Sequence, residues 1–269
     1  MSISALVDKA LAIFRRDLLT SSRYRGALIF TAIGTLAELA AFYYLARAVG
    51  PSFRPEGFDY FSFLLVGTGF YTFLLMGIHS FLQSVQEAQQ TGSFEVLMTT
   101  ETSAPVLLLL TATSACARNL VQLILYVGAG FLIFKPVAPS ISISAVLLTF
   151  TLSLGIVIAI GFMAAALQVT FQKGSVILWA LGSSAWLLTG TLFPISNLPH
   201  PLMLAARMIP ITHALASMRL ALLAGIGLGA VRQEIVTLSV FCAFLLPLGF
   251  WAFSYSLHKA RQEGTLSNY

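Results

Sequence analysis

Six long apolar runs dominate the sequence and decide what the chain can fold into. A segment inside a lipid bilayer must satisfy its backbone hydrogen bonds internally, and about 20 apolar residues in a helix cross the hydrocarbon. Charged residues make up only 9% of the chain, whereas a soluble domain has about a quarter. The sequence therefore predicts an all-α membrane protein with six transmembrane helices in one domain, 26–257. The predicted spans are 26–48, 59–82, 105–134, 144–171, 176–193 and 235–257.

Residues 1–25 have a different pattern. Apolar residues recur there at intervals of three and four, and charged residues lie between them. This spacing is typical of a helix with one apolar face, and such a helix lies along a membrane surface. We expect a cytoplasmic amphipathic interface helix at 1–25. Its apolar residues are Ile3, Leu6, Val7, Ala10, Phe14 and Leu18.

The distribution of Lys and Arg predicts the orientation, because cytoplasmic segments of membrane proteins are enriched in both. With the N-terminus inside, eight of these cations fall in cytoplasmic segments and three in short outer loops. We therefore expect a multi-pass protein of the cell membrane (plasma or inner membrane) with cytoplasmic termini, ending in a tail at 258–269. The net charge of +5 is then an orientation signal, and no nucleic-acid partner is expected. The inner cations are Lys9, Arg15, Arg16, Arg23, Arg25, Lys173, Lys259 and Arg261; the outer ones are Arg47, Arg54 and Lys135.

The segment 194–232 is too apolar for a free loop and too often interrupted by proline for a span. Its prolines separate apolar pieces of about ten residues, a length typical of short re-entrant or interfacial helices. Non-helical backbone at that depth has to be buried in protein or line a wet cavity. The sequence predicts re-entrant helices in this last extracytoplasmic loop. The prolines are Pro194, Pro199, Pro201 and Pro210.

No pattern of catalytic or metal-binding residues occurs in the sequence. The chain contains no G-x-x-x-x-G-K-[ST] phosphate loop and no H-E-x-x-H, C-x-x-C or G-x-S-x-G motif. Its four histidines are scattered. We therefore expect no catalytic residue, no metal and no cofactor in this chain.

Two ionisable residues, Glu38 and Arg118, lie deep inside predicted spans. Each is roughly 18–20 Å from the cytoplasmic end at the rise of an α-helix. An isolated charge at that depth is unfavourable, so each needs a partner or water. They either form an ion pair between the first and third spans or face a substrate path. Asn119 and Gln122 give the third span one polar stripe, which favours a packed or wet face.

The segment 83–104 contains three glutamates and neither lysine nor arginine. Anionic lipid head groups repel such a segment, whereas a protein of complementary charge can hold it. Phe94, Val96, Leu97 and Met98 offer an apolar anchor of the kind that dominates interface energetics. The segment is either a docking element for a cytoplasmic protein or a turn that packs on its own helices.

Three stretches resemble the permease subunit of ABC exporters of the type-2 class, which export polysaccharides, lipid-linked glycans and drugs. They are FRRDLLTSSRYR before the first span, QEAQQTGSFEVLMTTETSAPVLLL before the third and GTLFPISNLPHPLMLAARMIPITHALASMR after the fifth. The resemblance covers nearly the whole chain, and the spaced prolines of the last stretch are its most specific part. The chain departs from the family at Gln89 and Gln90, where the family often has a basic residue.

The resemblance implies a six-span fold that forms the export path as a homodimer, with two copies of a separate ABC ATPase that binds ATP and Mg. A coupling helix within 83–104 would contact that ATPase, and the N-terminal helix, with Arg15 and Arg16, would make a second contact. Re-entrant helices would form the exit. The coupling residues implied are Gly92, Ser93, Phe94, Glu95, Leu97 and Met98; those of the outer segment are Phe193, Pro194, Pro199, Pro210 and Arg219.

One alternative comes from a different class: a secondary transporter or channel-like bundle that uses Glu38 as a proton or ion site. An intramembrane enzyme is a more distant alternative, because no catalytic set is present. A lipid-like molecule, a glycan and a drug are all compatible as substrates. The scarcity of polar groups in the spans favours a lipid-like or amphipathic one, with membrane lipids as the other neighbours.

Overall fold

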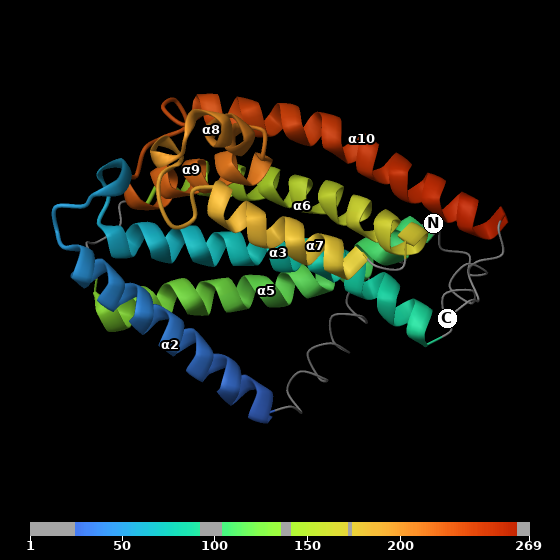
Figure 1. The fold of residues 1–269 in the computed structure, drawn as a ribbon, viewed down its shortest axis with the longest axis horizontal. Coiled ribbons are helices and arrows are strands. Elements are labelled where there is room, and N and C mark those ends of the chain that lie inside the picture. Colours follow the sequence, from blue (N-terminus) through green and yellow to red (C-terminus); the bar gives the residue numbers. More distant parts are fainter. Residues whose placement is uncertain (1–24, 92–103, 136–140, 172–173, 263–269) are drawn as a thin grey trace.

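The computed structural model describes residues 25–91, 104–135, 141–171 and 174–262, which form a bundle of helices (Figure 1). The secondary structure of these ranges is helical, as predicted. The long helices are α2 (Arg25–Val49), α3 (Tyr60–Gln90), α5 (Ala104–Phe134), α6 (Ile143–Phe171) and α10 (Arg232–Gln262). The shorter ones are η1 (Pro55–Gly57), α7 (Gly174–Leu188), η2 (Ile195–Asn197), α8 (His200–Arg207) and α9 (Pro210–Leu223). The interface helix predicted at 1–25 lies outside the described residues, apart from Arg25.

Five of the described helices are long and apolar enough to cross a membrane: α2, α3, α5, α6 and α10. They correspond to the predicted spans one to four and six. At the place of the fifth, α7 has 15 residues and is about 22 Å long, shorter than the ~30 Å of hydrocarbon in a bilayer. It ends before the predicted limit because the chain turns at Thr189 and Gly190, the latter with a φ of 78°.

α3 is the central helix of the bundle. Of its most apolar 18 residues 83% are buried, against 6% for α2 and for α5 and 11% for α10. α5, α6, α7 and α9 pack around it, while the N-terminal part of α2 leans away (Figure 1). Phe63, Leu64 and Leu65 have no exposed surface. A helix that is apolar all round is buried all round, so the core of the protein follows α3.

α6 and α10 pack closely along their length. Gly249 of α10 lies against the backbone of Ala159, where a Cβ atom would overlap the carbonyl oxygen. The hydroxyls of Thr170 and Ser256 are 2.7 Å apart, and Ser256 also donates to the carbonyl oxygen of Ala166 at 3.0 Å. Small residues allow close approach of helices in a membrane, and hydrogen bonds between them then add to the packing.

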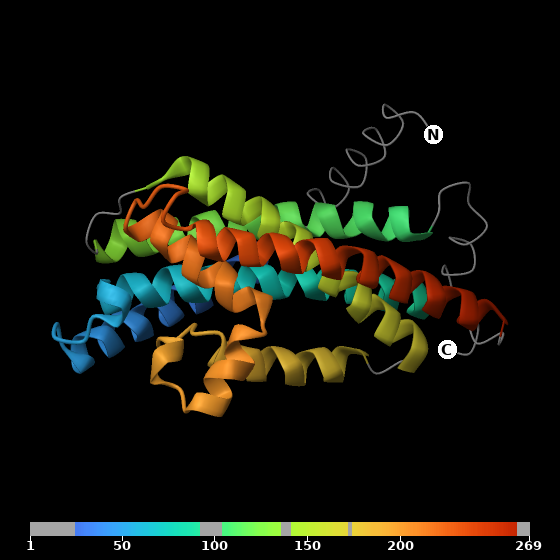
Figure 2. The ribbon, with the colours of Figure 1, turned by 90° about the horizontal axis from the view of Figure 1, so that it is seen from above.

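The bundle has two ends, which we call the α8 end and the Gln89 end. The α8 end holds the connection from α2 to α3, the C-terminus of α5, the short helices α8 and α9 and the start of α10 (Figure 2). The Gln89 end holds the last turns of α3, α6 and α10 and the first turn of α7. Because α3 continues to Gln90, the first part of the segment 83–104 extends this helix.

The proline-rich segment divides into short helices, as its sequence predicts. Pro199 directly precedes α8, and Pro210 is the first residue of α9. α9 is largely buried against α3, α6 and α10. Near its C-terminus the N–H of Ser142 donates to the carbonyl oxygen of Ala221 at 2.9 Å. The re-entrant position of these helices in a membrane stays a prediction.

Candidate functional sites

The residues predicted to contact an ATPase lie outside the described part of the chain. α3 ends at Gln90, shortly before the segment 92–103, which contains six of them. The residues concerned are Arg15, Arg16, Gly92, Ser93, Phe94, Glu95, Leu97 and Met98.

A cluster of three glutamines, the glutamine junction (Gln86, Gln89 and Gln168), joins helices at the Gln89 end. Gln168 of α6 donates through Nε2 to Oε1 of Gln89 at 3.1 Å, and its own Oε1 accepts from the backbone N–H of Gly174 at 2.9 Å. Gln86 Nε2 lies 3.5 Å from the same oxygen. Gln89 and Gln168 are only 3% and 4% exposed. One side chain therefore links α6 to α3 and to the first residue of α7, and its partner Gln89 precedes the segment 92–103 by three positions in the sequence.

Glu38 faces a narrow polar groove between α2, α3 and α5. The groove has a volume of about 60 Å³, which is room for water. Asn119 and Gln122 line it, together with Tyr126, whose buried hydroxyl has no hydrogen-bond partner among the described residues. A carboxyl group, two amides and a hydroxyl thus meet at this groove, at whose mouth Glu38 and Gln122 are exposed. The rest of the lining is Thr35, Gly69, Thr72, Phe73, Met76 and Leu123.

Arg118 lies on the same helix as this polar stripe, but it is exposed and does not line the groove. A charge exposed at the middle of a span is unfavourable in lipid. The face of α5 at Arg118 therefore needs water or another protein surface. Its part in a substrate path or in an ion pair with Glu38 stays a prediction.

Arg219 of α9, predicted as part of the outer segment, is buried at the α8 end with 2% of its surface exposed. Its Nε donates to the carbonyl oxygen of Phe63 at 3.3 Å and its Nη2 to that of Thr191 at 3.0 Å. Cζ lies 3.5 Å from the centroid of the Phe63 ring, a cation–π contact. The guanidinium fills the space beside Gly67, where a Cβ atom would overlap it. Arg219 therefore joins α9 to α3 and to the turn after α7.

Among the described residues, no carboxylate forms a hydrogen bond with the charged guanidinium of Arg219. Burial lowers the pKa of Arg219 to about 10, an effect that the charge of Glu56 opposes. The guanidinium is still positively charged at neutral pH. Because a buried charge is costly unless its hydrogen bonds are made, the two carbonyl groups have to hold their positions around it.

His213 of α9 and Glu234 of α10 form a second link at the α8 end. His213 Nδ1 lies 2.5 Å from Glu234 Oε2, and Nε2 lies 2.9 Å from the carbonyl oxygen of Arg207. Both partners are acceptors, so both ring nitrogens can donate only when the imidazole is protonated. The hydrogen bond to Glu234 raises the pKa of His213 above its usual value, although desolvation opposes this. The link is therefore strongest with a charged histidine.

The fit around Arg219 is tested by replacing Gly67 with alanine. The new methyl group displaces the guanidinium from its two carbonyl partners. We expect the melting temperature of the detergent-solubilised protein to fall by about 3–9 °C, from about 1–3 kcal/mol of overpacking and ~3 °C per kcal/mol in a chain of this size. Gly128→Ala on α5 is the matched control, because a Cβ atom there meets nothing within 4 Å. Equal melting temperatures of the two variants would contradict the packing.

The link between His213 and Glu234 predicts a pH-dependent contribution to stability. A histidine whose pKa is raised by folding stabilises the protein fully below its unfolded pKa of about 6.5, and the contribution is lost as the pH rises through the folded value. We expect the melting temperatures of wild type and His213→Gln to differ most near ~pH 6 and to converge towards ~pH 8. In a Glu234→Gln background this pH dependence should disappear, and its persistence there would argue against the link.

Comparison with known proteins supplies the family. The profile of the ABC-2 type transporter family matches residues 8–223, from the N-terminal segment to the last residue of α9. No curated protein matches the chain. The matched region includes the groove, the glutamine junction and Arg219. Members of this family are membrane components without an ATPase of their own. The chain belongs to the ABC-2 type transporter family and, as its sequence predicts, is a permease subunit.

Proposed function

We propose that the chain is the membrane-spanning subunit of an ATP-driven exporter and that two copies form the translocation path. Each copy docks one copy of a separate cytoplasmic ABC ATPase, which binds ATP and Mg. The family match supports the permease role. The glutamine junction is the observation that carries the coupling between the ATPase and the spans.

In the proposed topology, α7 and the residues up to 193 form the fifth of six spans, and both termini lie in the cytoplasm. The Gln89 end then faces the cytoplasm of a plasma or inner membrane, and the α8 end faces outward. α8 and α9 enter from the outside without crossing. Two features support this: prolines begin or precede both helices, and α9 is covered by α3, α6 and α10. The interface helix at 1–25 lies on the inner surface.

The coupling route begins at the segment 92–103, whose displacement reaches Gln89 through the last turn of α3. Gln168 transmits this displacement to α7, because its side chain forms hydrogen bonds with both Gln89 and the N–H of Gly174. Further along the bundle, the hydroxyl of Tyr71 on α3 donates to the carbonyl oxygen of Gly182 on α7 at 2.5 Å. α3 and α7 are thus joined at two depths, which supports their moving as a pair when the ATPase closes.

Assembly of two copies is supported by the exposed Arg118 on α5. Lipid is an unfavourable neighbour for this charge, whereas a second permease or a water-filled path between two copies satisfies it. In this arrangement the outer prolines and aromatic residues shape the exit. The substrate is a lipid-like molecule, a glycan or a drug, and the apolar spans favour a lipid-like or amphipathic one.

The polar groove around Glu38 favours a second candidate, a secondary transporter or channel-like bundle in which that carboxyl group binds a proton or ion. Asn119, Gln122 and the hydroxyl of Tyr126 would supply its polar neighbours. Transport by the purified chain that needs a pH gradient, proceeds without ATP and is abolished by Glu38→Gln would favour this candidate over the exporter.

Replacing Gln168 with leucine tests the coupling route, because it removes the junction while nearly keeping the side-chain volume. We expect the complex with the ATPase to assemble, but a spin label at Ser183 of α7 should lose most of its ATP-dependent change in mobility. Losing buried hydrogen bonds costs about 1–3 kcal/mol each, enough to break the link. Gln83→Leu, on the exposed side of α3, is the matched control. An equal ATP response in both variants would exclude this route.

The docking segment itself is tested by the double variant F94A/E95A. Removing the apolar anchor and its neighbouring charge should reduce recovery of the ATPase with the affinity-purified permease by about tenfold, the effect of losing ~1.4 kcal/mol of binding free energy. The control F53A/E56A replaces the same two residue types at the α8 end. This variant should recover as much ATPase as the wild-type chain does. Failure of the wild-type chain to recover any ABC ATPase would refute the exporter proposal.

A further inference from the structure

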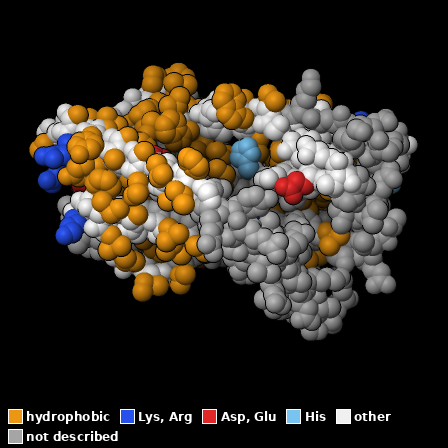
Figure 3. Space-filling view, turned by 90° about the horizontal axis from the view of Figure 1, so that it is seen from below, with side chains coloured by type: hydrophobic (Ala, Val, Ile, Leu, Met, Phe, Trp, Pro, Cys, Tyr) orange, Lys and Arg blue, Asp and Glu red, His pale blue; other side chains and the backbone are white. Residues whose placement is uncertain are grey.

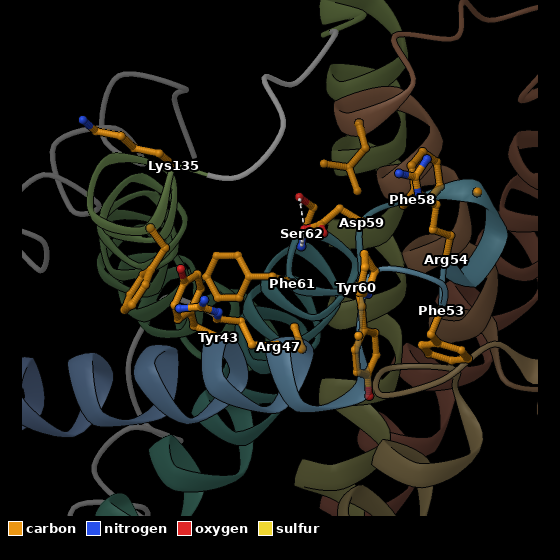
Figure 4. A pocket seen from close by; sticks show the side chains of 16 residues that line it. Tyr43, Arg47, Phe53, Arg54, Phe58, Asp59, Tyr60, Phe61, Ser62 and Lys135 are labelled. Atoms are coloured by element: carbon orange, nitrogen blue, oxygen red, sulfur yellow. Dashed lines mark hydrogen bonds between the residues drawn. The ribbon is translucent and has the colours of Figure 1, made fainter.

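A large cavity lies at the α8 end, on the side of α2 and α5. Its volume of about 890 Å³ falls within the roughly 300–1,000 Å³ of pockets that hold small organic ligands. The last turns of α2 and α5, the connection at 50–58 and the first turn of α3 form its walls (Figure 4). It is separate from the groove around Glu38, with which it shares no lining residue.

All three cations that the predicted topology assigns to the short outer loops line this cavity: Arg47, Arg54 and Lys135. Figure 4 shows Arg47 and Arg54 on different sides of the first turn of α3, and Lys135 at the end of α5 with its side chain directed away from both. One carboxylate, that of Asp59, lies between them. It caps α3 by accepting from the N–H of Ser62 at 3.1 Å and from its hydroxyl at 3.3 Å. The lining therefore carries more positive than negative charge, and its one anion is already engaged.

The backbone at Lys135, directly after α5, has a left-handed conformation. Its φ is 45°, in the left-handed region where glycine is the favoured residue at the end of a helix. Glu56, in the same wall, has a φ of 55° as well, but it does not line the cavity, and its charge acts on Arg219.

Aromatic rings form the wall next to these cations. Tyr43 contacts Phe61 and Phe134, with ring centroids 5.6 Å and 4.8 Å apart. Arg47 lies over the Tyr43 ring, with Cζ 5.9 Å from its centroid. Cations beside aromatic rings at the ends of spans are typical of the level at which a protein meets lipid head groups.

The helices that carry the cavity expose apolar side chains beside it. Tyr44 and Leu45 are exposed on α2, and Leu132 and Ile133 on α5. In the view of Figure 3 the Lys and Arg side chains gather at the α8 end, next to a broad hydrophobic face. A ligand with an anionic head and an apolar chain satisfies both surfaces, whereas a free inorganic anion satisfies only the cavity.

We propose that this cavity binds the anionic head of an amphiphile, a phosphate group carried on an apolar chain. Arg47 contacts the phosphate, because its planar guanidinium presents paired donors that match the phosphate oxygens, and Arg54 and Lys135 add positive charge from other sides of the cavity. The apolar chain lies along the exposed faces of α2 and α5. Two sources supply this chemistry: an anionic phospholipid of the membrane, or the exported molecule itself. The site belongs to the single chain and needs no ATPase.

The test measures lipid binding to the purified full-length chain in neutral detergent. Phosphatidylglycerol and phosphatidylcholine with identical acyl chains are titrated, and bound lipid is counted by native mass spectrometry. We expect tighter binding of phosphatidylglycerol, and an apparent Kd raised about tenfold in R47Q/R54Q, because charge-assisted hydrogen bonds are lost. The control R207Q/R232Q removes the same charge from exposed positions at the same end, outside the cavity, and should bind as wild type does.

Equal binding of the two lipids, or equal weakening in both double variants, would overturn the proposal. Arg54→Gln alone provides a further test that packing does not confound, since Arg54 is exposed in the connecting loop; it should weaken phosphatidylglycerol binding more than Arg207→Gln does. Competition by glycerol 3-phosphate, which has the head without the chain, should be weak, and competition as strong as that of the intact lipid would overturn the role of the apolar faces.

The source of the amphiphile is distinguished in the complex with the ATPase. Fluorescent phosphatidylglycerol is bound first, and its release is then followed after ATP is added. If ATP accelerates release of the lipid, the cavity belongs to the export path. If the rate of release is unchanged, the cavity holds a resident membrane lipid. Both results support the binding site. Absence of cavity-dependent binding by the chain alone refutes the site and leaves the exporter proposal standing.

Discussion

The buried charge of Arg219 is the constraint on which the α8 end depends. In an apolar interior this guanidinium cannot recover the water it has lost, so its hydrogen bonds must come from groups that cannot move away. It takes them from the backbone of Phe63 and Thr191 and places its flat face on the ring of Phe63. The carbonyl of Phe63 belongs to α3 and that of Thr191 to the turn that ends α7. α9, α3 and this turn are therefore positioned as one unit.

α3 connects the contacts of Arg219 at the α8 end to the contacts at the Gln89 end. It has 31 residues and is about 46 Å long, and packing on all sides prevents it from bending into free space. Its first turns are held by the Asp59 cap and by Arg219, and its last turns by the glutamine junction. A buried rod fixed at both ends transmits a displacement that a flexible or exposed helix would absorb. α7 is fixed to α3 at two places, by the hydrogen bond to Gly182 and, through Gln168, by that to Gly174.

Much of this architecture follows from the sequence, and the exceptions have physical reasons. Apolar runs and their polar interruptions located the five long helices, because a membrane leaves the backbone few alternatives. The same reasoning made the fifth span too long, since the apolar residues after Leu188 continue as an ordered turn around Arg219. Arg219 stood out in the sequence, but its ligands are backbone carbonyls, which no residue type reveals. Gln89 showed only as a departure from the family pattern, because its partner Gln168 is 79 positions away. The groove was predicted in part. The polar stripe on α5 indicated a wet or packed face, and the structure shows that Glu38 of α2 lines the same groove.

In the proposed topology, the two ends of the bundle also depart in opposite ways from the usual distribution of cations. Positive charge normally gathers on the cytoplasmic side, yet the segment 83–104 has none, and the short loops of the other end have three. Orientation is not lost, because the cations before the first span dominate it. The cation-free segment 83–104 and the three outer cations then each need a specific binding partner rather than the bulk lipid head groups on their side of the membrane. We propose a protein as this partner for the acidic segment with its apolar anchor, and an anion for the three cations around the aromatic cavity. Under both proposals, the charges that contribute least to the predicted topology lie where the permease meets its partners.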